Sequence, residues 1–306
     1  MKEQLIFNHS DISNEIAISS AVHEMSVGGR SDSVLIRFID VNGQWDRWKP
    51  EAGSIIEYKN EGISTGIMYL YHTQPEENYY SIRAYSMPLS GTLVNSRTWE
   101  RVHFFQIGEA IAKANGLTFE SYGMKDIVYD YLVQKSVTDL RFFHNLCMLE
   151  RAAMIVYDGK LIAAYEPYLE SVEPKVEIDT IGAEVEYYDN NCLRYGSAMV
   201  TSGQYRGVFK APKDNNRIFI PKDSISCTSN AEAIRFATGL LRNENKMLRS
   251  GSIKDAIMPQ FAAGTMVNIK NDKAPSWSGN FYIHKIRHDY GKKKSTLFFR
   301  EALEGY

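Results

Sequence analysis

The chain has 306 residues, and its 35 lysines and arginines against 37 aspartates and glutamates give a formal net charge of −2. This balance gives no broad basic field, so a nucleic-acid backbone is not the expected main partner. No stretch approaches the roughly 20 apolar residues of a membrane span, and the N-terminal apolar run is too short for a signal peptide. The cysteines, Cys147, Cys192 and Cys227, are scattered and odd in number, which predicts reduced thiols in a cytoplasmic setting.

The first ~90 residues have the pattern of β-strands. Residues 15–18 and 34–39 flank a turn-rich segment at 26–32, which predicts a hairpin, and a meander of strands follows Trp45. The 19 tyrosines and 14 phenylalanines favour half-buried β-surfaces, either in a core or in an interface.

The period changes near residue 104, where the sequence predicts a small α/β segment. Apolar residues at helical spacing predict a helix over about 105–112, which Asn115-Gly116 ends. A second helix is predicted over about 138–152 with Thr138 as its N-cap. Residues 153–157 and 160–165 then predict a hairpin around Asp158-Gly159.

Strands are again predicted at 176–178, 184–188 and 197–200. A third helix interrupts them over about 230–248, with Asn230 as its N-cap and Gly251 as its stop. The predicted organisation is therefore β, then α/β, then β with a helical insertion.

The order of turns and strands near the start of the chain returns near its end. Residues 45–50 lead to Gly53, a strand at 55–58, Gly66, and strands at 67–72 and 80–84. In the same order, Pro259 leads to Gly264, a strand at 266–269, Gly279, and strands at 281–288 and 296–300. The likeness lies in order rather than identity, and it predicts two copies of one β-unit.

None of the candidate catalytic or metal motifs is complete. His284 and His288 have the spacing of two zinc ligands, but on a predicted strand this spacing separates them by about 13 Å. The pair His23-Glu24 lacks the rest of an HExxH motif, and Gly28-Gly29 lacks the context of a phosphate-binding loop. Cys147 lies on the apolar face of its helix, which favours a buried small hydrophobe over a nucleophile. We therefore expect no catalytic, cofactor-binding or metal-binding residues.

Two carboxylate pairs are the remaining candidates for chemistry. Glu76-Glu77 lies in a polar turn, whereas Glu184 and Glu186 share one face of a strand about 6 to 7 Å apart. That separation touches the range of glycosidic acid–base pairs, but a solvated face or a negative wall of a DNA-passing lumen accounts for it as well. Trp45 and Trp48 are typical either of anchors in a protein interface or of packing around a turn. The run Lys292–Lys294 is typical of a solvent-exposed hairpin.

Several segments resemble one family of proteins. Residues 134–143 have a glutamine and a polar turn opening a helix with adjacent aromatics, and residues 154–161 form a strand with an Asp-Gly turn. Together they resemble the central segment of the late control protein D family, the baseplate hub proteins of contractile phage tails. Residues 38–53 and 105–117 are similar to the family's first domain and first middle-domain helix, and 259–288 to its last domain. Residues 211–229 match least.

This resemblance implies an α+β, β-rich fold in which two tube-like β-barrel domains flank a small α/β domain. The expected boundaries are 1–92 for the first β-domain, 93–170 for the central domain, 171–212 with 251–306 for the second β-domain, and 213–250 for a helical insertion. It also implies a structural, non-enzymatic homotrimer that joins the sixfold tail tube to the threefold central spike, in a phage or a phage-tail-like bacteriocin (tailocin).

The implied partners are a central spike protein, the tail tube or tube-initiator protein and baseplate wedge proteins, with no cofactor and no specific nucleic acid. Because the sequence ends at Tyr306 without a β-helical repeat, we expect the spike to be a separate polypeptide. Assembly is expected in the host cytoplasm, and the final location is the baseplate at the distal end of the tail tube. The alternative is a carbohydrate-binding or cell-wall-lytic module of the same particle, favoured by the aromatic residues and the Glu184–Glu186 pair.

Overall fold

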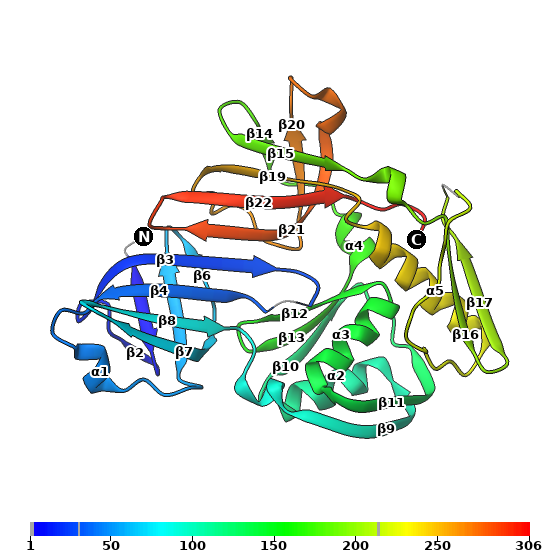
Figure 1. Cartoon of the computed structure of the whole chain (residues 1–306), viewed down its shortest axis with the longest axis horizontal. Helices are drawn as coiled ribbons and strands as arrows, with labels where there is room; N and C mark the ends of the chain where they lie inside the picture. Colours follow the sequence, from blue (N-terminus) through cyan, green and yellow to red (C-terminus); the bar gives the residue numbers. More distant parts are fainter. Residues whose placement is uncertain (1–2, 30, 213–214) are drawn as a thin grey trace.

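The computed structural model describes residues 3–29, 31–212 and 215–306. Most of the molecule is β-sheet, and a long open sheet runs from one end to the other in the order β15-β19-β22-β21-β3-β4-β8-β7-β5-β1-β2. Figure 1 shows most of these strands stacked from top to bottom. The β-rich class expected from the sequence is therefore confirmed. The pairings of the described strands form an open path with ends at β15 and β2 rather than a closed barrel.

The first β-domain is built around a buried cluster that includes Val34, Ile36, Phe38, Ile56 and Leu70. Alternating burial along β4 places every second side chain in this core, as a half-buried strand requires. Its elements are β1 (Gln4–Phe7), β2 (Ser10–Asp11), β3 (Ala17–Ser26), β4 (Ser33–Ile39), α1 (Gln44–Trp48), β5 (Ile55–Asn60), β6 (Ile63–Ser64), β7 (Met68–Glu76), β8 (Tyr79–Tyr85) and the 3-10 turn η1 (Leu89–Thr92).

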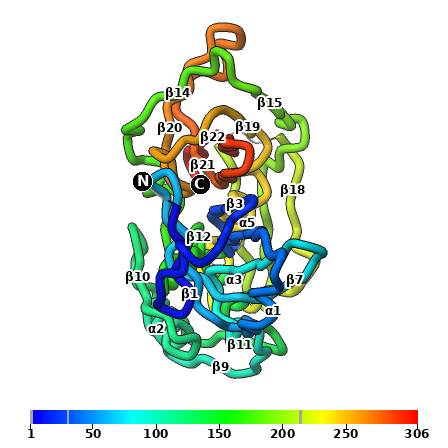
Figure 2. Tube along the Cα trace, turned by 90° about the vertical axis from the view of Figure 1, so that its left-hand side faces the viewer, coloured from blue at the N-terminus to red at the C-terminus, as the bar shows by residue number. Residues whose placement is uncertain are grey.

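The central segment carries two of the longer helices, and Figures 1 and 2 both place it at the end of the molecule away from β14 and β20. Both sequence-predicted helices are present, and Thr138 caps the second by accepting a hydrogen bond from the Arg141 amide at 3.2 Å. The hairpin turn at Asp158-Gly159 is confirmed, because Tyr157 pairs with Lys160. The elements are β9 (Val94–His103), α2 (Phe104–Ala114), β10 (Thr118–Tyr122), β11 (Val128–Thr138), α3 (Asp139–Leu149), β12 (Ala152–Tyr157), β13 (Lys160–Tyr165) and α4 (Glu166–Glu170).

The second β-domain has its own buried cluster, which includes Ile253, Val267, Ile269, Phe281 and Leu297. It is formed by β14 (Glu177–Asp179), β15 (Glu184–Asp189), β19 (Arg249–Ala256), β20 (Met266–Lys270), β21 (Gly279–Asp289) and β22 (Lys294–Glu301), with the 3-10 turns η2 (Asn191–Leu193) and η3 (Pro275–Trp277).

Helix α5 (Asn230–Asn245) interrupts this domain and packs on β16 (Ser197–Ser202) and β17 (Tyr205–Lys210), which pair with β18 (Ile218–Phe219) as a separate sheet. Buried residues of α5 and β16, such as Phe236 and Val200, share one cluster with α2 and α3 of the central segment. The approach is close, since a Cβ on Gly239 would lie 2.2 Å from the Leu149 carbonyl oxygen. Strands β16 and β17 therefore share the core of the central segment.

Two details of the third helix were predicted wrongly. Ser229, not Asn230, caps α5, because its side chain accepts a hydrogen bond from the Glu232 amide at 3.1 Å. Gly251 does not end the helix but lies inside β19, where a Cβ would come within 2.4 Å of the Glu186 carbonyl oxygen. Glycine is needed there for close approach of two strands.

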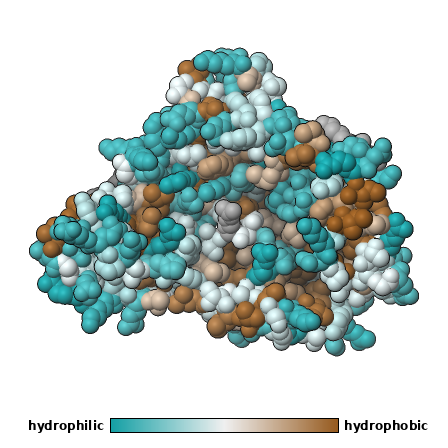
Figure 3. Space-filling view, viewed as in Figure 1, coloured by the Kyte–Doolittle hydropathy of each residue, from teal (hydrophilic) through white to brown (hydrophobic). Residues whose placement is uncertain are grey.

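Apolar side chains gather on the surface at the right of Figure 3, over the part of the molecule formed by β16 and β17. Exposed apolar residues of this part include Val208, Ile218 and Ile220. Helix α5, the longest described, does not have the length and apolar composition that a membrane crossing requires, and neither does any shorter described helix.

Candidate assembly edges of the repeated domains

The two β-domains have the same strand order. The first runs β3-β4-β8-β7-β5, and the second runs β15-β19-β22-β21-β20. The register agrees as well: Ile55 and Ile56 face Tyr69 and Met68 in the first domain, and Met266 and Val267 face Tyr282 and Phe281 in the second. The order of turns and strands noted in the sequence therefore corresponds to a repeated pairing scheme.

A shared irregularity strengthens the correspondence. In β7 the register against β8 shifts between Leu70 and His72, and in β21 the register against β22 shifts between Ile283 and Lys285. The extra residues are Tyr71 and His284, which are thereby equivalent. A bulge bends its strand, so both long strands change direction at the same point.

Strands β3 and β21 join the two domains (Figure 1). Beyond its bulge, β21 leaves β20 and pairs with β3, so that Lys285 faces Ser26 and His288 faces His23. Glu24 of β3 forms ion pairs with Lys285 at 3.0 Å and Arg287 at 3.7 Å across this junction. Main-chain pairing and charge thus fix one domain against the other.

Two buried histidines lie opposite each other in the junction. Burial, and then the neighbouring His288, lowers the pKa of His23 to about 3, and burial lowers the pKa of His288 to about 4. The rings are 6.1 Å apart, and His288 Nδ1 lies 2.7 Å from the Ser295 hydroxyl. Both rings are therefore neutral near pH 7, so neither places an uncompensated charge in the buried part of the junction.

The same comparison shows which edges are free. In the described chain, residues 72–76 of β7 pair only with β8, although the equivalent residues 285–289 of β21 also pair with β3. Strand β15, the equivalent of β3, pairs only with β19 among the described strands. Each free edge is thus the counterpart of an edge that is paired in the β3–β21 junction.

Backbone alternation shows which residues face the free edge of β7. The Val27 amide donates to the His284 carbonyl oxygen at 2.9 Å, and the Tyr290 amide donates to the Ala21 carbonyl oxygen at 3.0 Å. The backbone N–H and C=O groups of Ile286 and His288 therefore point toward β3. The equivalent residues of β7 are Thr73 and Pro75, whose backbone groups point toward its free edge. Within one chain the missing N–H of Pro75 costs no hydrogen bond, because it points to the open side of β7; a strand that pairs on this side finds one donor fewer than β3 finds on β21.

The zinc-like spacing of His284 and His288 lies on a strand, as expected. His284 is the bulge residue and is half-buried, whereas His288 is fully buried. Neither histidine belongs to a metal-type cluster of three or more His, Cys, Asp or Glu within the described residues.

The carboxylate pairs are engaged in ordinary surface contacts. Glu184 accepts a hydrogen bond from Lys254 Nζ at 2.7 Å, which lowers the pKa of Glu184, and Glu186 accepts one from the Tyr188 hydroxyl at 2.8 Å. Glu76 binds Arg37 at 2.6 Å. Glu77 is exposed in the turn after β7.

Among the other residues singled out from the sequence, Trp45 and Trp48 contact each other edge to face, with ring centroids 5.2 Å apart. Trp45 is 2% exposed and stacks on Phe38, so it is a core residue, while Trp48 is 39% exposed. Cys147 is buried, and burial raises the pKa of its thiol well above the ordinary value. Gly28 and Gly29 have positive φ angles of 96° and 93° after β3. Lys292 and Lys293 lie in the turn between β21 and β22, and Lys294 is the first residue of β22.

The edge residues Thr73, Pro75 and Asp189 were not among the residues predicted from the sequence. Their only sequence signal is the repeat itself, with a proline inside one copy of a strand whose other copy has none. Assigning them needs the strand pairings, because only these show which edge stays open.

No protein-family model matches the sequence, and no curated protein matches it. Solved structures do match the fold. The tail protein of Neisseria meningitidis MC58 superposes with a TM-score of 0.75 at 10% identity, over 98% of this chain and 96% of that one. The 43 kDa tail protein of prophage MuSo2 from Shewanella oneidensis gives 0.75 at 10% identity, over 98% of both chains.

A component of the E. coli type VI secretion system, described as structurally similar to the T4 tail proteins gp27 and gp5, gives a TM-score of 0.61 at 11% identity. That match covers 95% of this chain and 76% of the other. The chain therefore has the fold of these phage tail proteins and of this secretion-system component.

Proposed function

We propose that the chain is the structural hub of a contractile-tail baseplate, a homotrimer that joins a sixfold tail tube to a threefold spike. The observation that carries this proposal is the repeated β-domain with two complementary free edges. Three copies of a two-domain chain present six similar units in one ring. A closed ring also leaves no free edge for continued growth.

The junction within the chain serves as the template for the junction between chains. In this arrangement β15 of one subunit pairs with residues 72–76 of β7 in the next, as β3 pairs with β21. Carrying the β3–β21 register over through the equivalent residues places Asp189 opposite Thr73 and Tyr187 opposite Pro75. Each β-domain then acts as a tube-like unit, and the sheet continues around the ring.

The wider setting rests on the fold shared with phage tail proteins and on the resemblance to the late control protein D family. In this setting the hub contacts a separate central spike protein, the tube or its initiator, and baseplate wedge proteins at the distal end of the tube. Its role is mechanical and not enzymatic. The ion pair of Glu184 and the exposed face of β15 support a strand surface rather than a catalytic carboxylate pair.

Light scattering on the purified chain tests the ring. A particle of three times the 34.9 kDa of one chain is expected. Because like charges directly opposite in a sheet repel, Thr73→Glu places a carboxylate against Asp189 and is expected to raise the dissociation constant about tenfold. The matched variant Thr73→Lys is expected to keep the trimer, and Asp189→Lys is expected to restore it in the Thr73→Glu background.

A stable monomer, or an assembly whose mass is the same in Thr73→Glu and Thr73→Lys, would contradict the proposed junction. Circular dichroism on each variant shows whether the fold is intact, which is expected because Thr73 is exposed.

A further inference from the structure

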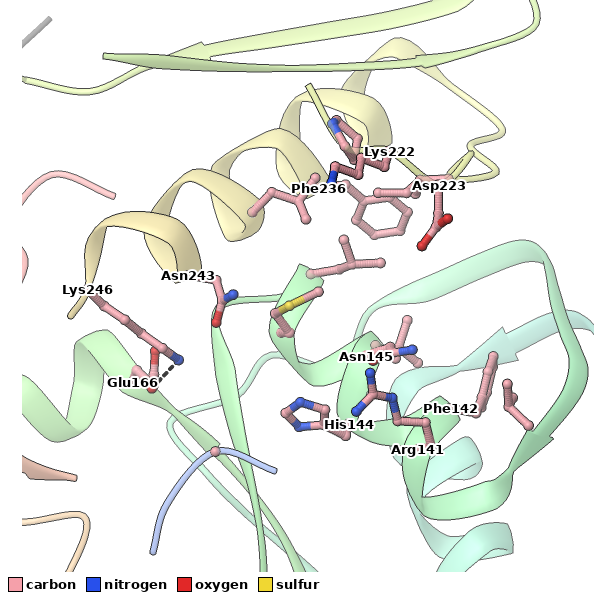
Figure 4. Close-up of a pocket in the computed structure, with 18 of the residues that line it drawn as sticks. Arg141, Phe142, His144, Asn145, Glu166, Lys222, Asp223, Phe236, Asn243 and Lys246 are labelled. Carbon is pink, nitrogen blue, oxygen red and sulfur yellow. Dashed lines mark hydrogen bonds and ion pairs between the residues drawn. The ribbon is translucent and has the colours of Figure 1, made fainter. Parts of the chain in front are cut away.

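A large cleft lies between α3 and α5, outside the edges of the ring. It has a volume of about 1300 Å³. The end of β11, residues 221–226, the turn after β3 and residues of α4, β21 and β22 form the rest of its walls. Figure 4 shows Arg141, His144 and Asn145 of α3 across the cleft from Asn243 of α5 and from Lys246, which directly follows α5. Pockets for small ligands measure about 300 to 1000 Å³, so this cleft has room for a larger occupant.

The lining of the cleft is basic, although the whole chain is slightly acidic. Glu166 and Asp223 are its only acidic lining residues in the described chain. The basic lining residues are Lys135, Arg141, Lys222, Lys246, Lys285 and Arg300. The cleft therefore carries an excess of positive charge in a protein of net charge −2.

Part of this positive charge is not compensated within the described chain. Lys246 and Arg300 bind Glu166 at 3.2 and 3.4 Å, and Lys285 binds Glu24. Lys135, Arg141 and Lys222, by contrast, are exposed and have no carboxylate within ion-pair distance among the described residues. These three residues are called the free cations of the cleft.

Apolar side chains form the floor between the charged walls. Leu146 of α3 and Phe236 and Leu240 of α5 lie at the base of this floor and are themselves buried, whereas Leu149 of α3 is half-buried and Met247, shortly after α5, is 40% exposed. An occupant therefore gains from burying its own apolar groups as well as from charge.

His144 reports the positive field inside the cleft. Burial first, and then Arg141 and Lys246, lowers the pKa of His144 to about 4. The imidazole is therefore neutral near pH 7 and adds no charge of its own to the cleft.

We propose that this cleft binds an acidic, amphipathic polypeptide segment of another protein. The segment places apolar side chains between α3 and α5 and its carboxylates against Lys135, Arg141 and Lys222. The apolar floor favours a polypeptide over a nucleic acid, because a phosphate backbone is held by continuous basic surface and has no apolar side chains to bury. This proposal is independent of the ring.

A random peptide library displayed on phage, selected on the immobilised full chain, tests the proposal. We expect the selected peptides to be rich in aspartate, glutamate and large apolar residues. Labelled copies of these peptides are then measured by fluorescence anisotropy against the Lys135→Glu, Arg141→Glu double variant. We expect the double variant to bind the peptides with a dissociation constant about ten times larger, which corresponds to a loss of about 1.4 kcal/mol of binding free energy over the two contacts.

The matched control is the Lys125→Glu, Lys273→Glu double variant, which makes the same charge change at exposed lysines outside the cleft. The proposal is supported if this control binds the peptides with unchanged affinity. It also requires that peptide binding by the unmodified chain weakens as the salt concentration rises.

Three results would overturn it. The first is selected peptides without acidic enrichment, or with affinity insensitive to the cleft variant. The second is a labelled DNA or RNA oligonucleotide that binds the cleft more tightly than the peptides do. The third is a change in the mass of the peptide-free protein in the cleft variant alone, which would make the cleft a contact between copies of this chain.

Discussion

At the scale of single residues, the junction of the two β-domains depends on histidines that stay neutral. His23 and His288 have no exposed surface, and neither ring nitrogen of His23 has a hydrogen-bond partner among the described residues. Charging either ring would bury an uncompensated cation. The junction is therefore expected to weaken in acid.

The pKa values of His23 in the folded and unfolded chain determine how stability changes with pH. An unfolded histidine binds its proton below about pH 6.5, whereas His23 in the folded chain does so only near 3. Between these values the unfolded state holds more protons, so stability falls as the pH falls. Replacing His23 with phenylalanine removes this proton uptake. Relative to the unmodified chain, His23→Phe is expected to gain about 1.4 kcal/mol of unfolding free energy per pH unit below about 6.5.

Urea unfolding at about pH 7 and about pH 5 measures this difference. Burial raises the pKa of Asp32 to about 7, so Asp32 contributes stability that increases as the pH falls. This contribution is the same in both proteins and cancels when their unfolding free energies are compared. A difference between the proteins that does not change with pH would show that His23 does not titrate on unfolding.

At the scale of elements, a buried charge network ties α4, α5 and β22 together. Glu166 and Glu170 of α4 accept from Arg242 of α5, and both also contact Arg300 of β22. Burial alone would raise the pKa of Glu166, but Lys246, Arg300 and Arg242 hold it at about 2. The network thereby connects the α-helical core to the second β-domain.

Glu166→Gln removes one charge from this network and leaves the buried arginines undercompensated. Breaking a buried ion pair from one side costs about 3 to 5 kcal/mol, so a loss of that size in the unfolding free energy is expected. Glu173→Gln, at an exposed position shortly after α4, makes the same chemical change and is expected to shift stability by less than about 0.5 kcal/mol. Equal losses in the two variants would rule out a stabilising role for the network.

At the scale of the whole molecule, the proposed ring predicts which residues of neighbouring subunits meet. In a Cys192→Ser background, cysteines at Thr73 and Asp189 are expected to form an intersubunit disulfide, because directly opposite strand residues have Cα atoms within disulfide range. Oxidation should then give covalent dimers and trimers on a non-reducing gel. The out-of-register pair Thr73→Cys with Glu184→Cys is the control. Equal cross-linking of both pairs would contradict the register of the junction.

Much of the architecture was predictable from local sequence. Apolar spacing and an N-cap threonine predicted α3, and the Asp-Gly turn predicted the β12–β13 hairpin. Both predictions were possible because these signals act between residues close in the chain. The ends of α5 were less predictable. Ser229 and Asn230 are both good N-caps, and only the hydrogen bond to the Glu232 amide distinguishes them.

By itself, the sequence determined the β-rich class, the helices and the presence of a repeat, since periodicity and turn chemistry are local properties. Only the tertiary structure decided that β3 pairs with β21, that β7 and β15 stay open, and that α3 and α5 enclose a basic cleft. Val22–Ser26 and Lys285–Asp289 are far apart in the chain, and their pairing depends on two folded sheets presenting edges of matching register. Such pairing leaves no local pattern to read, because any exposed strand edge offers the same backbone groups.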